Sequence, residues 1–291
     1  MLFLNQLING LHLGSIYALI ALGYTMVYGI VKLINFAHGD ILMIGAYTSL
    51  IMITSLNQSP FLALIASVLV CTAVGVAIEA VAYKPLRNSP RISALITAIG
   101  MSYLIENIAQ LIYGAEPRPF PNVINNVPII SGEINLGFLT LLTIVSSAII
   151  LYITRTIVFK TKTGKAMRAV SEDLLAARLM GVNVNKTISI TFALGSALAG
   201  FGAFLYSAAY PTVTPFMGFN PGLKAFIAAV LGGIGMLEGA MLGGFIMGVV
   251  EAFSKAFISS QLADAIVYGI LIIVLLVRPS GILGKPMIEK V

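Results

Sequence analysis

Long apolar runs, separated by short polar segments, follow one another along almost the whole chain. A helix that spans a bilayer needs about 20 apolar residues. The runs therefore predict spanning helices at 8–31, 40–56, 61–83, 92–113, 135–153, 187–209, 224–236, 239–257 and 261–277. We expect an all-α polytopic membrane protein with about eight or nine transmembrane helices. It would form a single membrane domain over residues 1–291.

The glycine-rich stretch 224–257 departs from this pattern, because it is long for one span and short for two. Gly235, Gly239 and Gly243 recur at every fourth position, a spacing that lets two helices approach closely. Two alternatives stay open: tight helix packing, or a broken or re-entrant helix that lines a pathway. The candidate pathway residues of this stretch are Gly232, Gly233 and Gly235.

Composition supports a membrane protein and leaves no separate soluble domain. The chain is 58% hydrophobic and only 10% charged, whereas a soluble domain is about 25% charged. The first basic residue is Lys32, so a cleavable signal peptide is not expected and the first span is retained. Cys71 is the single cysteine, which excludes an internal disulfide and a CxxC site.

The basic residues predict the orientation. If successive spans cross in opposite directions, 14 of the 17 basic residues lie on one side of the membrane. The other three are Arg118, Lys224 and Lys255. The positive-inside rule makes the crowded side cytoplasmic, with the N-terminus outside and the C-terminus in the cytoplasm. The net charge of +6 thus reflects membrane orientation and not a nucleic-acid partner.

Residues 155–186 form the longest polar segment and hold seven of the 17 basic residues. Helix-capping signals predict a short helix over 172–180, with acidic residues in its first turn and glycine just past its end. A second short helix, 165–170, would begin after Thr163. The helix at 172–180 would either dock on a partner or lie flat on lipid headgroups. Its key residues are Ser171, Glu172, Asp173, Ala176, Ala177, Arg178 and Gly181.

Polar residues within the apolar runs are candidates for a translocation pathway, because they are costly in a membrane. Asn35, His38 and Asp40 would form a turn or gate at the cytoplasmic junction of the first two spans, or else a wet loop with capping residues. Glu106 and Gln110 share one helix face and would line the outer half of the pathway or bond a neighbouring helix.

Four further polar residues lie within the apolar runs. Glu79 is expected to pair with Lys84 or Arg87 near the surface. Asn9, His12 and Ser15 lie on roughly one face of the first span and are weaker candidates.

Several catalytic patterns are missing from the sequence. It has no GxxxxGK[ST] phosphate loop, so this chain would carry no cofactor and ATP would bind to partner subunits. It also has no HExxH, GxSxG or paired Cys/His cluster, and His12 and His38 are far apart. We therefore expect no catalytic residues and no metal site, which argues against a membrane-embedded enzyme.

Three ordered segments resemble branched-chain amino acid permeases of ABC importers. They are 9–47, which contains NFAHGD; 164–206, which contains SEDLLAARLMG; and 224–251, which contains VLGGIGMLEG. The resemblance covers nearly the whole chain. Related urea permeases share the plan, but the NFAHGD form favours amino acids.

The resemblance implies a permease subunit in a bacterial or archaeal inner membrane. Ser171–Gly181 would be the coupling helix, where Glu172, Asp173 and Arg178 contact an ATPase. The expected partners are a second, similar permease in a heterodimer, two cytoplasmic ATPase subunits and an extracytoplasmic solute-binding protein. A urea or amide permease is the alternative within the class, and an ion-driven secondary transporter is the alternative outside it.

Overall fold

A computed structural model describes residues 2–87, 89–124, 128–130 and 136–284. Most of these residues are helical, and the few strands are two or three residues long. The helices are α1 (Leu2–Val31), α2 (His38–Thr54), α3 (Pro60–Ile78), the π-helix η1 (Glu79–Tyr83), α4 (Arg91–Tyr113), α5 (Phe138–Lys160), α6 (Lys162–Glu172), α7 (Leu174–Leu179), α8 (Val184–Ala209), α9 (Phe219–Gly232), α10 (Leu237–Phe257) and α11 (Ala263–Val277).

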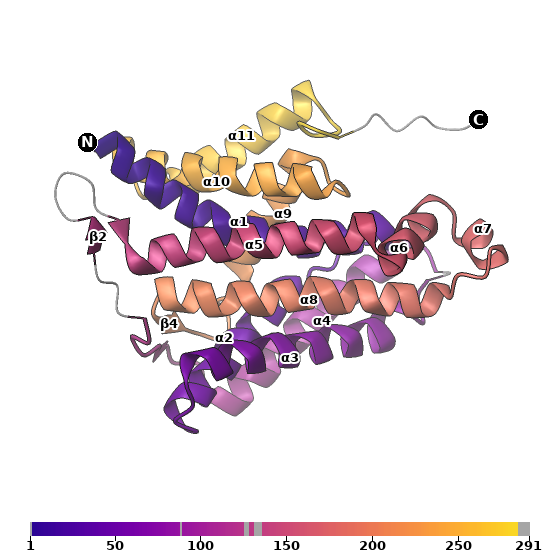
Figure 1. The fold of residues 1–291 in the computed structure, drawn as a ribbon, viewed down its shortest axis with the longest axis horizontal. Coiled ribbons are helices and arrows are strands. Elements are labelled where there is room, and N and C mark those ends of the chain that lie inside the picture. Colours follow the sequence, from indigo (N-terminus) through magenta and orange to yellow (C-terminus); the bar gives the residue numbers. More distant parts are fainter. Residues whose placement is uncertain (1, 88, 125–127, 131–135, 285–291) are drawn as a thin grey trace.

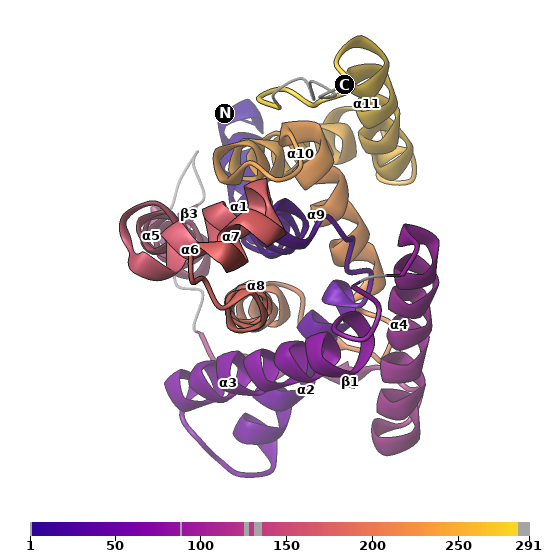
Figure 2. The same ribbon diagram turned by 90° about the vertical axis from the view of Figure 1, so that its right-hand side faces the viewer.

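Helix α1 is the centre of the bundle. It is apolar on every side, and each of its residues from Leu13 to Val27 is buried, as expected for a helix surrounded by protein. It packs against α5, α8, α9 and α10. Figure 2 shows these helices around α1, with α2, α3 and α4 on one side and α11 on the other.

Glycines set the distance between α1, α9 and α10. In α10, Gly239 and Gly243 meet the backbone of α9, while Gly244 and Gly248 meet the backbone of α1. Four residues separate the members of each pair, so each pair presents a flat strip on one side of the helix. The tight-packing alternative for this segment is therefore confirmed.

Gly244→Ala is expected to destabilise the protein. The new Cβ would lie 2.5 Å from Ala18 N and 2.6 Å from Ala18 Cα, so α1 and α10 would have to separate. Overpacking of this kind costs about 1–3 kcal/mol. Thermal unfolding in detergent can be followed with a thiol-reactive dye, because Cys71 is fully buried until the protein unfolds.

Gly269→Ala is the matched control, since it lies in α11 and its new Cβ would meet nothing within 4 Å. It should keep or raise the unfolding temperature, because alanine favours a helix more than glycine does. A Gly244→Ala protein as stable as the Gly269→Ala protein would contradict the assigned packing.

The glycine-rich segment is broken, as the second alternative proposed, but its bounds differ from the prediction. Helix α9 begins at Phe219, five residues before the predicted start, and ends at Gly232. Gly233 and Gly235 then have φ values of +114° and +94°, which only glycine adopts readily. The chain reverses there and α10 packs back on α9.

The membrane-protein class is confirmed, whereas the exact number of crossings stays a prediction. Within the described residues, 6 helices are long and apolar enough to span a bilayer. Helices α9 and α11 are shorter apolar helices, and the 14 residues of α9 reach only about 21 Å at 1.5 Å per residue. Much of α3, α4 and α5 faces outward with apolar side chains, as lipid-facing helices do.

The two ends of the bundle differ in character. At one end α6 and α7 project from α5 and α8 (Figure 1). At the other end the short strands β1 (Arg118–Pro119) and β4 (Thr212–Val213) pair antiparallel, and so do β2 (Pro128–Ile130) and β3 (Leu136–Gly137). Lys285, Lys290 and the side chain of Arg91 lie outside the described residues. The orientation of these ends in a membrane stays a prediction.

Candidate functional site

The projecting element consists of α6 and α7, and its start differs from the prediction. Ser171 is not an N-cap: it lies inside α6, and its hydroxyl donates to the Arg168 carbonyl at 2.7 Å. Glu172 is the last residue of α6 and does not open the next helix. Asp173 caps α7 instead, because its Oδ1 accepts hydrogen bonds from Leu175 N at 2.7 Å and Ala176 N at 3.0 Å.

The cap of the preceding helix also moves. Thr161, and not Thr163, is the N-cap of α6, since its Oγ1 accepts a hydrogen bond from Gly164 N at 3.1 Å. The predicted helix 165–170 therefore extends over Lys162–Glu172. Because α5 runs on to Lys160, the polar segment is almost entirely helical.

The end of α7 agrees with the prediction. Gly181 has a φ of +81°, its N–H donates to Arg178 O at 3.0 Å, and Val182 N donates to Ala177 O at 3.0 Å. These bonds close the helix as glycine-ended helices commonly do. Ala177 is buried and packs in the same cluster as Val182 and Ile188, so one side of α7 is fixed to the bundle.

The other side of α7 is apolar and open. The side chains of Leu175, Leu179 and Met180 are 70%, 88% and 84% exposed. Exposed Glu172 and Arg178 flank them. α7 lies at the extreme end of the molecule, beyond the ends of α5 and α8 (Figure 1). Apolar side chains grouped at such a tip and bordered by charge are typical of a protein-binding surface.

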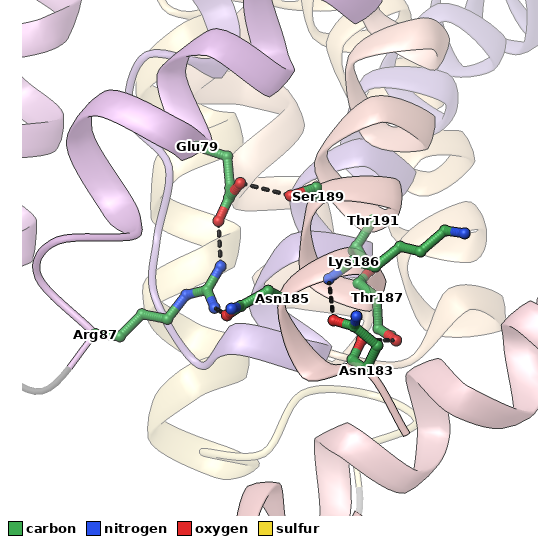
Figure 3. Close-up of polar contacts among 8 residues, drawn as sticks. All are labelled: Glu79, Arg87, Asn183, Asn185, Lys186, Thr187, Ser189 and Thr191. Carbon is green, nitrogen blue, oxygen red and sulfur yellow. Dashed lines mark hydrogen bonds and ion pairs between the residues drawn. The ribbon is translucent and has the colours of Figure 1, made fainter. Parts of the chain in front are cut away.

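A polar cluster connects the beginning of α8 to the end of α3 (Figure 3). Arg87 donates to Asn185 Oδ1 and forms an ion pair with Glu79, and Ser189 donates to Glu79 Oε2 at 2.7 Å. Asn183 caps α8 by accepting from Lys186 N at 3.0 Å. The predicted pairing of Glu79 with Arg87 is thus confirmed, but Glu79 is only 1% exposed and not near the surface.

The connection continues into the loop between α1 and α2. Tyr83 lies in the π-helix that begins at Glu79, and its hydroxyl donates to Asn35 Oδ1 at 3.1 Å and lies 3.2 Å from Ile34 O. Its ring also packs on Phe192 of α8, with centroids 5.1 Å apart. Polar contacts, joined by the π-helix, therefore connect the residues that follow α7 to Asn35.

Asn35, His38 and Asp40 are buried, so the wet-loop alternative is wrong. Each is at most 2% exposed, and the N-cap position of α2, Ala37, makes no side-chain cap bond. The loop turns back toward the bundle centre, and His38 packs against Gly23 and the Tyr24 ring. Within the described residues, Asn35 Nδ2, His38 Nε2 and Asp40 Oδ2 are buried without a hydrogen-bond partner.

The two predicted pathway clusters meet in space. The side chain of Asp40 faces Ser102 and Glu106 where α2 packs against α4. Glu106 therefore faces a neighbouring helix, and half-buried Gln110 lies one turn further along α4. A hydrogen bond from Glu106 to that helix stays a prediction. The two carboxyl groups are 66 positions apart in the chain, and no local pattern could have paired them.

The glycines proposed for the pathway have a different environment. A Cβ on Gly232 would overlap the backbone of Gly239, and one on Gly233 would lie 2.7 Å from Gly284 N. Gly235 faces Gly29 of α1. These three residues form the turn that joins α9 to α10 and serve close packing there.

Comparison with known proteins identifies relatives of this chain. A family model described as "Branched-chain amino acid transport system / permease component" matches residues 6–276. The high-affinity branched-chain amino acid transport system permease protein LivH of Salmonella typhimurium is 43% identical over 99% of this chain and 98% of its own. The corresponding protein BraD of Pseudomonas aeruginosa is 43% identical over the same shares of the two chains.

More distant proteins also match. A probable branched-chain amino acid transport permease protein, LivH of Methanocaldococcus jannaschii, is 29% identical over 93% of this chain and 89% of its own. No solved structure matches the chain. With a family match over most of its length and relatives above 40% identity, the chain belongs to the family of branched-chain amino acid transport system permease components.

Proposed function

We propose that this chain is the permease subunit of an ABC importer that moves branched-chain amino acids across a bacterial or archaeal inner membrane. The observation that carries the proposal is the open apolar side of α7 at the tip of a capped helix. A permease that cannot bind ATP through a phosphate loop needs a surface through which another subunit drives it. Family membership supports the substrate class.

The partners follow from the same surface. Two ATPase subunits bind ATP, and one of them receives α7 in an apolar cleft, with Glu172, Asp173 and Arg178 at its margin. A second, similar permease completes the membrane part as a heterodimer, and a solute-binding protein delivers the amino acid at the opposite end. The α7 end is then cytoplasmic and the start of α1 is outside, as the basic residues predict.

The mechanism is alternating access driven through α7. Movement of the ATPase subunits shifts α7 and, through the junction at Asn183–Asn185, the beginning of α8. The contacts of Arg87 and Glu79 transmit this shift to the π-helix, and Tyr83 transmits it to the loop at Asn35. His38 and Asp40 begin α2 directly after this loop, so they form the gate.

Charge reversal at Glu172 tests this proposal. Glu172→Lys changes an exposed side chain that makes no cap bond to α7, so the fold should remain while ATPase coupling is lost. Asp173→Lys and Gly181→Val should have larger effects, because they also remove the cap and the left-handed turn of α7. The assay is ATP-dependent uptake by proteoliposomes that contain the purified complex and its binding protein.

Leucine and urea are the substrates to compare. The proposal is supported if leucine stimulates ATP hydrolysis by the complex and Glu172→Lys uncouples that hydrolysis from leucine uptake. Stimulation by urea alone would overturn the substrate class. Uptake that follows an ion gradient and needs no ATPase would overturn the ABC assignment, as would full leucine uptake in all three variants.

A further inference from the structure

A cavity of about 280 Å³ lies at the end of the bundle opposite α7, between the first half of α1, the end of α8 and the end of α10. Its size is close to the lower end of the range for small-molecule sites, about 300 Å³. Leu13, Ile16 and Ala252 form an apolar part of its wall. Gln6, Asn9, His12 and Lys255 form a polar part.

These polar residues do not suit a lipid-facing groove. Polar and charged side chains within spanning helices almost always face protein or a water-filled cavity. His12 Nε2 is buried and has no hydrogen-bond partner within the described residues, and Asn9 donates only a long bond of 3.5 Å to Gln6. The cavity therefore offers hydrogen-bonding groups to a polar ligand.

A network of charges lies beside this cavity. Glu251, 2% exposed, accepts hydrogen bonds from Tyr17 at 2.9 Å, Lys224 at 2.8 Å and Lys255 at 2.6 Å. Lys224 also pairs with Asp264 at 2.7 Å. A buried carboxylate must stay paired, and Lys224 and Tyr17 satisfy Glu251 even when Lys255 turns away.

Lys255 is thus the cation that can exchange partners. Its side chain is 42% exposed and lines the cavity, whereas the side chain of Lys224 is 8% exposed and held by two carboxylates. An anionic group that enters the cavity can take the ammonium of Lys255 without leaving an unpaired buried charge. The side-chain carbonyls of Gln6 and Asn9 line the same cavity and can accept hydrogen bonds from a positive group.

We propose that this cavity binds the transported amino acid at the end opposite α7, with its carboxylate on Lys255 and its aliphatic side chain against Leu13 and Ala252. The proposal rests on the proposed function for the identity of the ligand. A zwitterion with an apolar side chain matches the wall on each count: one exchangeable cation, acceptors for an ammonium, and an apolar surface.

Cysteine protection tests the site without depending on transport. Ala209 lines the cavity and is half-buried, so Ala209→Cys adds a thiol there and keeps every polar group. The unsubstituted complex serves as the blank, because Cys71 is fully buried. Gln58→Cys is the control thiol, exposed in the loop between α2 and α3 away from the cavity.

Leucine is expected to slow the labelling of Ala209→Cys by a water-soluble maleimide at least about tenfold, and to leave Gln58→Cys unchanged. Leucinamide, which lacks the carboxylate, should protect poorly. Adding Lys255→Gln should raise the half-protecting leucine concentration about tenfold, the usual effect of losing a charged hydrogen bond, whereas Lys255→Arg should keep protection.

Leucine uptake by the unsubstituted complex is measured in parallel, so the two proposals can fail separately. ATP-driven leucine uptake with an unprotected or unlabelled Ala209→Cys would overturn the site alone. Labelling slowed by phosphatidylglycerol in nanodiscs but insensitive to leucine would assign the cavity to a lipid phosphate and overturn the site. Protection without ATP-driven uptake would keep the site and overturn the proposed function.

Discussion

Replacing Leu175 and Leu179 together by lysine is expected to abolish leucine uptake while the permease still folds. Both side chains are exposed, at 70% and 88%, so the packing of the described residues depends little on them. The Asp173 cap and buried Ala177 still hold α7, lysine favours a helix, and at position 179 it suits the last turn. A central apolar contact in an interface contributes about 2 kcal/mol or more, which is roughly 30-fold in affinity for each residue.

The measurement compares three properties of the same preparation: the ATPase subunits that co-purify, ATP-dependent leucine uptake, and the unfolding temperature reported by Cys71. We expect the first two to be lost and the third to be unchanged. Leu56→Lys is the matched control, because Leu56 is 55% exposed in the loop after α2, away from α7. Normal uptake in the Leu175/Leu179 variant, or an equal loss in Leu56→Lys, would contradict docking through α7.

The class of fold was predictable because hydropathy alone identifies spanning helices. The exact start of α7 was not, because two residues that favour N-cap positions, Ser171 and Asp173, lie close together. Thr161 already starts a helix that runs through Ser171, and a hydroxyl inside a helix bonds back to a carbonyl of the preceding turn. Asp173 is then the next residue that can serve as the N-cap of α7. A local pattern cannot decide this competition without knowing where α6 begins.

The position of the predicted gate shows a second limit. The apolar pattern resumes after Asp40, which suggests a surface loop before it. The chain instead folds back until His38 packs beside Gly23, eight residues before the end of α1, or about 12 Å along that helix. Gly23 has no side chain and leaves room for the imidazole. Such packing joins residues distant in sequence, as do the contacts of Tyr17 with Glu251 and of Asp40 with Glu106.

Glu79→Ala is expected to destabilise the protein by about 3–5 kcal/mol, the usual cost of removing one partner of a buried ion pair. Glu79 is 1% exposed and accepts from both Arg87 and Ser189. Its loss leaves the Arg87 guanidinium, 18% exposed, without a carboxylate. The unfolding temperature should fall on the order of 10 °C.

The double variant Glu79→Ala/Arg87→Met separates this charge effect from a general loss of packing. Removing both charges leaves no unpaired ion, so the double variant should be more stable than Glu79→Ala alone. Its uptake should still be reduced, because Arg87 no longer joins Asn185 of α8 to the π-helix. Recovery of stability without recovery of uptake would place these side chains in the transmission of movement from α7. Recovery of both stability and uptake would show that Glu79 and Arg87 form only a structural ion pair. Recovery of neither would show that the lost stability of Glu79→Ala comes from packing.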